Sequence, residues 1–335
     1  MSVRIAINGF GRVGRYIIRA CAGREDIEVI AINTRANAPV LEHILKYDSV
    51  HGIFDADVLA QGDVLWVADK KIKITNSTDS LETLPWKDLG IDIVMESTGK
   101  FRSRKDAAKH LDAGAKKVII AAPGKGVDGT FVMGVNEGSY DPERHHVVSN
   151  ASCTTNCLAP VVKTIHDCFT ISKGLMTTVH SYTMDQRLLD GSHKDLRRAR
   201  AAALSIVPTS TGAAKAVTEV IPELAGKLDG IALRVPTPNV SLIDVALEVK
   251  TKVTVDAVNG ALKKASEGAL RNILAYSDKE LVSVDFTSSP YSSIVDAPLT
   301  QVIGDTFVKI FSWYDNESGY ASRMRDLALY MGSRM

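Results

Sequence analysis

The first fourteen residues constrain the fold of this 335-residue chain more than any other stretch. Val3 to Asn8 has the apolar, β-branched composition of a strand, and Gly9-Phe10-Gly11-Arg12-Val13-Gly14 follows it at once. Apolar residues then recur with helical spacing, at Val13, Ile17, Ile18 and Cys21. This order predicts a dinucleotide-binding unit, since the three glycines allow the tight turn, the approach of a pyrophosphate and close helix–strand packing. A glycine-rich turn without a ligand is the alternative.

Alternating strands and helices continue this pattern through the first half of the chain. Strands are expected at 28–33, 92–95 and 117–120, with a helix around 107–113. Such alternation predicts an α/β fold with a parallel, doubly wound sheet, which binds ligands at its carboxyl edge. Ser97, Thr98 and Ala121 follow strands at that edge. Taken alone, these three residues are equally typical of ordinary connecting loops.

A polar segment with two cysteines lies near the middle of the chain and reads Ser-Asn-Ala-Ser-Cys-Thr-Thr-Asn-Cys-Leu-Ala-Pro, residues 149–160. A short strand precedes it, and apolar residues with helical spacing follow. Because Ser, Asn and Thr are good helix caps, we expect Cys153 at or just before a helix start, where free N–H groups favour a thiolate. A buried structural cysteine is the alternative, and the polar surroundings favour a nucleophile.

Charge and cysteine content argue against several classes of function. The chain has 40 Lys+Arg and 39 Asp+Glu, so electrostatics give no reason to expect nucleic acid or a membrane surface as a partner. We also find no apolar run of about 18 residues and no signal peptide. The four cysteines form no disulfide framework, and their spacing lacks a second ligand pair for zinc. We therefore expect a cytoplasmic enzyme without a metal.

Charged and hydroxyl residues in apolar surroundings mark three places in the second half. His180 ends a strand expected at 174–182 and is either a core residue or an acid–base group. Arg234 lies within an apolar strand and needs a partner, which is either an internal carboxylate or a bound phosphate. Thr211 and Gly212 precede an apolar helix and form either an anion-binding helix start or a plain cap.

A basic run at 193–200 contains Arg198 and reads as a solvated face, with nucleic-acid contact as a second interpretation. The balanced net charge and the absence of interleaved aromatic residues argue against nucleic acid.

The central segment and the sequence Thr-Thr-Val-His-Ser-Tyr-Thr around His180 resemble the phosphorylating glyceraldehyde-3-phosphate dehydrogenases, and the similarity covers essentially the whole chain. It implies that glyceraldehyde 3-phosphate is oxidised with inorganic phosphate and NAD(P) to 1,3-bisphosphoglycerate, through a cysteine thioester. Cys153 would be the nucleophile, and His180 would stabilise its thiolate and shuttle a proton. Erythrose-4-phosphate dehydrogenase activity and a non-catalytic binding protein of the same fold are the alternatives.

The resemblance also implies an architecture. Residues 1–150 and 316–335 would form a Rossmann-type dinucleotide-binding domain, and 151–315 a catalytic α+β domain with a mostly antiparallel sheet. The chain would assemble as a homotetramer, with the loop 185–203 at a subunit interface near the cofactor. Glycolysis or gluconeogenesis would be its metabolic setting.

The remaining site residues follow from the same resemblance and from the glycine motif. The cofactor-binding residues are expected to be Gly9, Gly11, Arg12, Val13, Gly14, Thr34, Arg35, Ser97, Thr98, Ala121, Ser192 and Asn316. The substrate phosphate is expected at Thr183 and Arg234, and inorganic phosphate at Ser152, Thr154, Arg198, Thr211 and Gly212.

The choice of dinucleotide depends on the residues after the second strand. An acidic residue there usually binds the ribose hydroxyls of NAD and repels the 2′-phosphate of NADP, whereas this chain has Thr34 followed by Arg35. Gly191 and Ser192 match the small, polar pair of family members that accept NADP. Asp79 opposes a phosphate at a position where relatives often carry arginine. We therefore predict that the protein uses both NAD and NADP.

Overall fold

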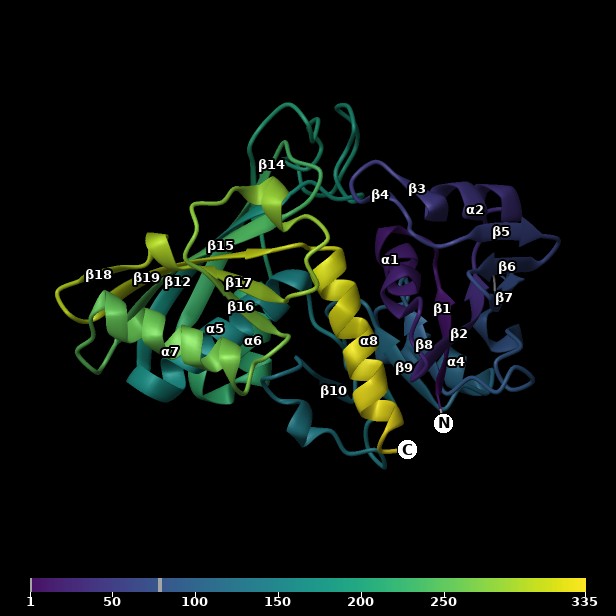
Figure 1. The fold of residues 1–335 in the computed structure, drawn as a ribbon, viewed down its shortest axis with the longest axis horizontal. Coiled ribbons are helices and arrows are strands. Elements are labelled where there is room, and N and C mark those ends of the chain that lie inside the picture. Colours follow the sequence, from purple (N-terminus) through teal and green to yellow (C-terminus); the bar gives the residue numbers. More distant parts are fainter. Residues whose placement is uncertain (1, 78–79) are drawn as a thin grey trace. The chain divides into compact units, whose positions relative to one another are not determined.

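The computed structural model describes residues 2–77 and 80–335, and the chain forms two compact units (Figure 1). Unit 1 contains residues 1–133, 137–152 and 321–335, and unit 2 contains 134–136 and 153–320. Each unit has its own large sheet, so the α/β fold class is confirmed. No helix within the described residues is both long and apolar enough to cross a membrane.

Unit 1 is built on a nine-stranded sheet in the order β10-β11-β9-β8-β1-β2-β7-β6-β5. The pairs from β10 to β7 are parallel, and β5, β6 and β7 add two antiparallel pairs at one edge. Its strands are β1 Val3–Asn8, β2 Ile27–Asn33, β5 Val58–Gln61, β6 Val64–Val67, β7 Lys70–Thr75, β8 Ile93–Glu96, β9 Lys117–Ile120, β10 Gly129–Thr130 and β11 Val147–Ser149. Every residue of β8 and β9 is buried, as expected of parallel strands covered on both faces.

Strand β1 lies where the chain reverses direction across this sheet. From β1 the chain adds β2 and β7 on one side, and it later returns to place β8 and β9 on the other. The carboxyl ends of β1 and β8 therefore meet at a topological switch point, where folds of this type bind ligands. A small antiparallel pair, β3 Tyr47–Asp48 and β4 Gly52–Ile53, lies outside the main sheet.

The helices of unit 1 are α1 Arg12–Cys21, α2 Ala38–Lys46, α3 Arg104–Ala107 and α4 Lys109–Asp112, together with α8 Ser318–Gly332 from residue 321 onward. Gly14, Ile17, Ile18 and Cys21 form the buried face of α1. This confirms three of the four residues predicted for it, while Val13 is only half-buried because it lies in the first turn. The single helix expected around 107–113 is instead two short helices. The chain tightens there, because Leu111 N bonds to Ala108 O three residues back, and Gly114 (φ +99°) ends the segment.

Unit 2 carries an eight-stranded sheet with helices on one face (Figure 1). The sheet order is β13-β14-β12-β15-β19-β17-β16, with β18 paired to β19. Its strands are β12 Ile171–Ser181, β13 Val207–Ser210, β14 Leu228–Val235, β15 Ser241–Val249, β16 Leu274–Ser277, β17 Ser293–Asp296, β18 Gln301–Ile303 and β19 Phe307–Tyr314, and its helices are α5 Cys153–Phe169, α6 Ala213–Val220 and α7 Val255–Glu267. Most pairs are antiparallel, while β12–β14 and β16–β17 are parallel.

The two faces of this sheet differ in chemistry. Residues alternate strictly between buried and half-buried along β15, as expected of a sheet with helices on one side only. Helix α5 packs against α6, α7 and the strands β15, β17 and β19. On the other face Leu175 and Ile231 are 68% and 51% exposed. This face of the sheet therefore exposes apolar side chains.

Candidate functional site

A sharp turn places Cys153 at the first residue of α5. Strand β11 ends at Ser149, and Ala151 adopts a left-handed conformation with φ +55°. For a residue other than glycine this costs about 1–2 kcal/mol, and only three residues separate the strand from the helix. Cys153 thus lies at the positive end of a 17-residue helix, as the sequence predicts.

His180 faces the thiol of Cys153. Its Nε2 lies 3.5 Å from Cys153 Sγ, and the residue is only 4% exposed. His180 Nδ1 lies 2.7 Å from the carbonyl oxygen of Ser181, which can only accept, and 2.9 Å from Arg234 Nη1, which can only donate. The two hydrogens of Nη1 are directed at Ser181 O and Thr183 Oγ1, so Nδ1 carries the proton of the neutral ring. The lone pair on Nε2 is then directed at the thiol. This arrangement makes His180 a proton acceptor for Cys153.

Burial sets the charge state of this pair. It raises the pKa of Cys153 above its ordinary value, and the Arg234 charge and hydrogen bonds from Thr154 only partly oppose it. Burial and the nearby Arg234 charge together lower the pKa of His180 to about 3. Loss of solvation therefore opposes the thiolate expected from the helix start, and it also favours the neutral form of the imidazole.

Arg234 and Thr183 form a cationic corner beside His180. Arg234 Nη1 donates to Ser181 O over 2.9 Å and to Thr183 Oγ1 over 3.1 Å, and it lies 2.9 Å from His180 Nδ1. Strand register explains the proximity, because β14 pairs with β12 so that Arg234 lies opposite His180. The structure thus brings together two residues predicted for the substrate phosphate.

Asp185 joins this corner to Arg198. Its carboxylate accepts a hydrogen bond from Thr183 Oγ1 and pairs with Arg198 Nη1. Burial alone would raise the pKa of Asp185, but the Thr183 hydrogen bond and the charges of Arg234 and Arg198 lower it. A carboxylate therefore lies among the groups predicted to bind anions, and the sequence gives no signal for this role beyond its place in the loop.

Arg198 contacts β13, the strand that directly precedes the start of α6. Its Nε donates to Thr209 Oγ1 over 2.9 Å and its Nη2 to Ser210 O over 3.3 Å. Directly after this strand, Thr211 Oγ1 accepts from Ala213 N over 3.2 Å, and Gly212 is the N-cap of α6. Arg198 and the start of α6 are therefore neighbours, as expected of residues that share one anion.

The hydroxyl of Thr154 points into the interior of unit 2. The residue is 4% exposed, and its Oγ1 lies 2.9 Å from Tyr314 Oη, which lies 2.9 Å from Thr178 Oγ1. Ser152 directly precedes α5 and is half-buried. The sequence gives no signal for the role of Tyr314, because an aromatic residue at the end of a strand is typical of the core.

Asn316 is fixed by two serines of unit 2. Its Oδ1 accepts from Ser181 Oγ and from Ser241 Oγ, each over 2.9 Å, and the residue is 7% exposed. The amide orientation is set by these two donors, which leaves Nδ2 as the group that can donate to a ligand.

The glycine motif fits a dinucleotide. Gly9 has φ +106°, and a Cβ there would lie 2.9 Å from Thr98 N. A Cβ on Gly14 would lie 2.1 Å from Gly9 O, so the turn and α1 can lie this close to each other only because both positions are glycine. Gly11 faces open space and is the N-cap of α1 without a side-chain hydrogen bond. A helix start of this kind, open at its N-cap, can bind a pyrophosphate through its first N–H groups.

A cavity of about 280 Å³ lies over this turn at the carboxyl edge of the sheet. Its lining residues come from the ends of β1, β2 and β8 and from the loops after β1, β2, β7 and β8: Asn8, Gly9, Phe10, Gly11, Asn33, Thr34, Arg35, Ser77, Leu81, Ser97, Thr98, Lys100 and Phe101. Thr34 and Arg35 are among them. Arg35 is exposed and makes no ion pair with any residue in the ranges 2–77 and 80–335.

The other residues predicted for the cofactor lie outside this cavity lining. Arg12 pairs with Asp48 on β3, and Val13 lies in the first turn of α1. Ala121 N bonds to Glu96 O over 2.9 Å at the end of β9. Ser192 lies on the exposed loop of unit 2, with its carbonyl held by Arg187 Nη2 over 2.7 Å. Asp79 lies outside the described residues.

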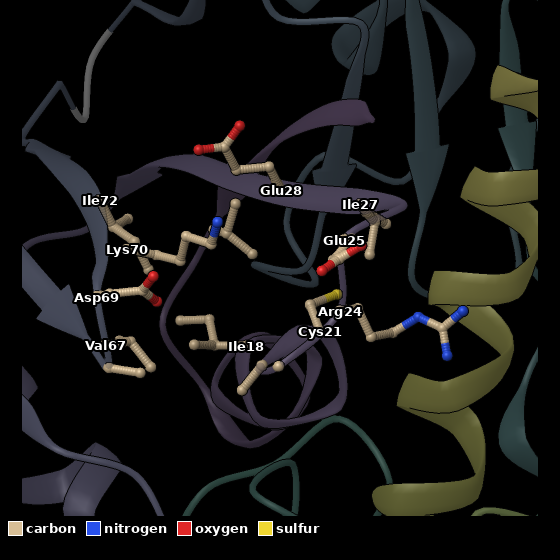
Figure 2. Close-up of a pocket in the computed structure, with 14 residues that line it drawn as sticks. Ile18, Cys21, Arg24, Glu25, Ile27, Glu28, Val67, Asp69, Lys70 and Ile72 are labelled. Carbon is tan, nitrogen blue, oxygen red and sulfur yellow. The ribbon is translucent and has the colours of Figure 1, made fainter. Parts of the chain in front are cut away.

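A second cavity, of about 210 Å³, lies at the opposite end of β2 (Figure 2). The end of α1, the turn into β2 and the β6–β7 hairpin line it. Charged groups of both signs, including Glu28 and Lys70, surround its apolar floor (Figure 2). Burial raises the pKa of Cys21 in this floor to about 12, so its thiol stays protonated. The cavity has none of the glycine geometry of the first one.

Comparison with known proteins gives full-length matches. The family model "Glyceraldehyde 3-phosphate dehydrogenase, NAD binding domain" matches residues 3–104, and "Glyceraldehyde 3-phosphate dehydrogenase, C-terminal domain" matches 152–316. Glyceraldehyde-3-phosphate dehydrogenase of Geobacillus stearothermophilus is 59% identical over 334 residues, covering 100% of this chain and 99% of the relative. The Priestia megaterium enzyme is 57% identical with the same coverage. Glyceraldehyde-3-phosphate dehydrogenase 2 of Trichormus variabilis is 56% identical, covering 97% of each chain.

Proposed function

The chain belongs to the glyceraldehyde-3-phosphate dehydrogenase family, and we propose that it oxidises glyceraldehyde 3-phosphate, with NAD and inorganic phosphate, to 1,3-bisphosphoglycerate. It is an NAD-dependent oxidoreductase. The observation that supports the catalytic assignment is the thiol of Cys153, 3.5 Å from His180 Nε2 at a helix start. Arg234 and Thr183 lie beside this pair, where they suit the phosphate of the aldehyde.

Cys153 and His180 share the proton chemistry. As Cys153 Sγ attacks the aldehyde carbon, its proton passes to His180 Nε2 and then to the aldehyde oxygen, which leaves a neutral hemithioacetal. Nδ1–H stays bonded to Ser181 O and stabilises the transient imidazolium. The positive end of α5 favours the negative charge that develops on sulfur and oxygen.

Oxidation returns the proton to His180. Bound NAD supplies a nicotinamide ring that takes up the hydride from the hemithioacetal carbon. As the carbon loses this hydride, Nε2 takes the hydroxyl proton and a thioester remains on Cys153. We assign Asn316 Nδ2 to the cofactor carboxamide, because its two serine donors leave that amide group as a donor.

Inorganic phosphate completes the reaction by attacking the thioester carbon. The carbon–sulfur bond breaks, the acyl phosphate is released, and the Cys153 thiolate regains its proton from His180 Nε2. Two anion sites are needed. We assign the substrate phosphate to Arg234 and Thr183, and inorganic phosphate to Arg198 with Thr211 and Gly212 at the start of α6. Ser152 and Thr154 would contribute to the second site through the first turn of α5, since the Thr154 hydroxyl is engaged by Tyr314.

One assay distinguishes this function from its alternatives. The purified protein is mixed with NAD and glyceraldehyde 3-phosphate, with and without inorganic phosphate, and NADH formation is followed. We expect rapid turnover only with phosphate. Turnover that is independent of phosphate and faster with erythrose 4-phosphate would instead identify a hydrolytic dehydrogenase. Absence of NADH under every condition would identify a binding protein.

We propose further that NADP serves as a second cofactor and that the enzyme works in the cytoplasm as a homotetramer. Thr34 and Arg35 in the cavity lining support NADP, because neither repels a 2′-phosphate. The free thiols of all four cysteines suit a reducing compartment. The exposed apolar residues of the loop 185–203 support assembly, and light scattering of the active protein tests it.

A further inference from the structure

A row of buried polar side chains crosses the carboxyl edge of the unit 1 sheet. Asn33, Asn8 and Glu96 end the neighbouring strands β2, β1 and β8, and they pair in register. All three are at most 5% exposed. Asn33 Nδ2 donates to Asn8 Oδ1 over 2.8 Å, and Asn8 Nδ2 donates to Glu96 Oε2 over 2.5 Å. The parallel register therefore builds a chain of hydrogen bonds that ends on the Glu96 carboxylate.

A second chain reaches the same carboxylate from the interior. Trp86 Nε1 lies 3.0 Å from His110 Nδ1, and both residues are fully buried. An indole nitrogen can only donate, so Nδ1 accepts and the proton of His110 lies on Nε2. That nitrogen is 3.2 Å from Glu96 Oε2. The tautomer of His110 is thus fixed by Trp86, and its proton is directed at Glu96.

Thr98 completes the surroundings of Glu96. Glu96 Oε1 accepts from Thr98 N over 2.8 Å and from Thr98 Oγ1 over 2.5 Å. Four donors therefore face the four acceptor positions of an ionised carboxylate. Within the described residues His110 is its sole ion-pair partner in range, and His110 is neutral because its Nδ1 accepts. Hydrogen bonds alone thus compensate the buried negative charge.

This carboxylate supports the turn that carries the dinucleotide motif. The position of a Cβ on Gly9 lies 2.9 Å from Thr98 N, so the turn rests directly on the segment that Glu96 holds. Ser97 Oγ also donates to the carbonyl oxygens of Asn8 and Gly9, each over 3.0 Å. We propose that Glu96, supported by His110 and Trp86, is a positioning residue for dinucleotide binding. This inference rests on the proposed function, since it concerns the same cofactor.

An isosteric substitution tests the carboxylate directly. In Glu96→Gln one acceptor oxygen becomes an NH₂ group, which meets donors from Thr98 or from Asn8 and His110. The Kd for NAD, measured by calorimetry, should rise at least tenfold. The rate at which iodoacetamide alkylates Cys153 without dinucleotide should not change. Glu28→Gln is the matched control, because Glu28 lies in the same sheet and its ion pair with Arg4, at 3.7 Å, lies outside the network.

A pair of substitutions at His110 tests the inner support without touching the cavity lining. His110→Leu removes the donor to Glu96 and the acceptor for Trp86, whereas His110→Gln keeps one of each. The Kd for NAD should rise at least fivefold in His110→Leu and return to within twofold of the parent in His110→Gln. Trp86 fluorescence should shift only in the leucine variant.

These measurements separate the positioning role from the function itself. A folded Glu96→Gln protein with the parent Kd would overturn the proposal, and so would equal affinity in the two His110 variants. If Glu96→Gln fails to fold, the comparison of NAD affinity between His110→Leu and His110→Gln tests the proposal instead. A parent protein that does not bind NAD would contradict the proposed function and the role of Glu96 with it, whereas a parent that binds NAD with unchanged Kd in the variants would contradict the role of Glu96 alone.

Discussion

At Cys153 the cost of burial opposes the charges that favour a thiolate. Burial raises its pKa, and the Arg234 charge and the Thr154 hydrogen bonds lower it. His180 is held neutral at physiological pH because its pKa falls to about 3. In the proposed mechanism the thiolate forms as the aldehyde reacts and His180 accepts the proton.

Replacing the nucleophile should separate chemistry from cofactor binding. Cys153→Ser should abolish phosphate-dependent aldehyde oxidation, because a serine hydroxyl at this site has no comparable nucleophilicity. The Kd for NAD should stay within about twofold of the parent, since the glycine cradle belongs to other residues. Calorimetry and a spectrophotometric NADH assay check both. Turnover that persists in the variant would contradict the thioester mechanism.

His180→Asn should make the protein less sensitive to acid. Folding lowers the pKa of His180 from 6.5 to about 3, so as pH falls the unfolded state takes up the proton first. The parent loses stability from about pH 6.5 down to about pH 3. Between pH 7 and pH 4 this loss amounts to about 3 kcal/mol.

Denaturant unfolding at both pH values measures this difference. Cys153→Ser keeps the histidine and should keep the acid sensitivity. An equal loss in His180→Asn and the parent would show that His180 is not the group responsible.

Thr34→Asp should restore discrimination between the two dinucleotides. An aspartate in the cavity lining repels the 2′-phosphate of NADP and can bind the ribose hydroxyls of NAD. The ratio of kcat/KM for NADP to that for NAD should fall at least tenfold, as steady-state kinetics would show. If the parent already prefers NAD by a thousandfold, about 4 kcal/mol, then Thr34 does not provide the tolerance inferred from its position.

At the scale of elements, the two glycine- or hydroxyl-rich helix starts were predictable because their signals are local. The start of α1 after Gly11 and the start of α5 at Cys153 both follow from cap chemistry and helical spacing. The antiparallel strands β5 and β6 were not expected, since β-propensity in short segments depends on the neighbours that pair with them. The break between α3 and α4 was not predicted either, because it depends on the tighter hydrogen bond from Leu111 N to Ala108 O, which the residues do not signal.

The site contacts that the residues alone did not reveal join distant parts of the chain. Thr154 and Tyr314 are 160 residues apart, and Asn8 and Glu96 are 88 apart. The residues gave only the chemistry of each side chain, while its partner is chosen by sheet order and register. The Cys153–His180 pair was predicted through family resemblance, because no local pattern links a helix start to the end of β12.

The loop 185–203 should hold subunits together through its apolar residues. Leu188, Leu189 and Leu196 are 83%, 73% and 82% exposed, which a free surface does not favour. A Leu188→Glu, Leu189→Glu double variant should dissociate the proposed homotetramer, because it places two charges in an apolar contact. Light scattering measures the mass. Val284→Glu, at an exposed position outside the loop, is the control, and an active monomeric parent would contradict the assignment.

At the scale of the whole molecule, unit 1 is closed by the last residues of the chain. Arg325 Nη1 donates to Ala20 O over 3.1 Å, and the rings of Tyr140 and Tyr330 lie 6.4 Å apart. Near the end of α8, a Cβ on Gly332 would lie 2.4 Å from Val3 Cγ2. The first strand and the last helix of the chain are therefore in close contact.

Gly332→Ala should loosen this closure. The added methyl group meets the stiff side chain of Val3, and overpacking of this kind costs about 1–3 kcal/mol. The thermal midpoint should fall, as differential scanning calorimetry would show. Gly138→Ala is the matched control, because a Cβ there meets no atom within 4 Å. Equal thermal midpoints for the two variants would mean that the Val3 side chain moves aside without a loss of stability.

The discontinuity of unit 1 also governs the order in which a growing chain can fold. Residues 1–152 leave the ribosome first, yet the segment that completes their unit begins at residue 321. At about 5–20 residues per second, the roughly 170 residues between them take roughly 10–30 s to synthesise. During that interval the dinucleotide-binding half stays unfinished, with buried faces exposed to chaperones. Unit 2 is almost continuous in the chain and can finish first, so unit 1 becomes complete only after residues 321–335 have been synthesised.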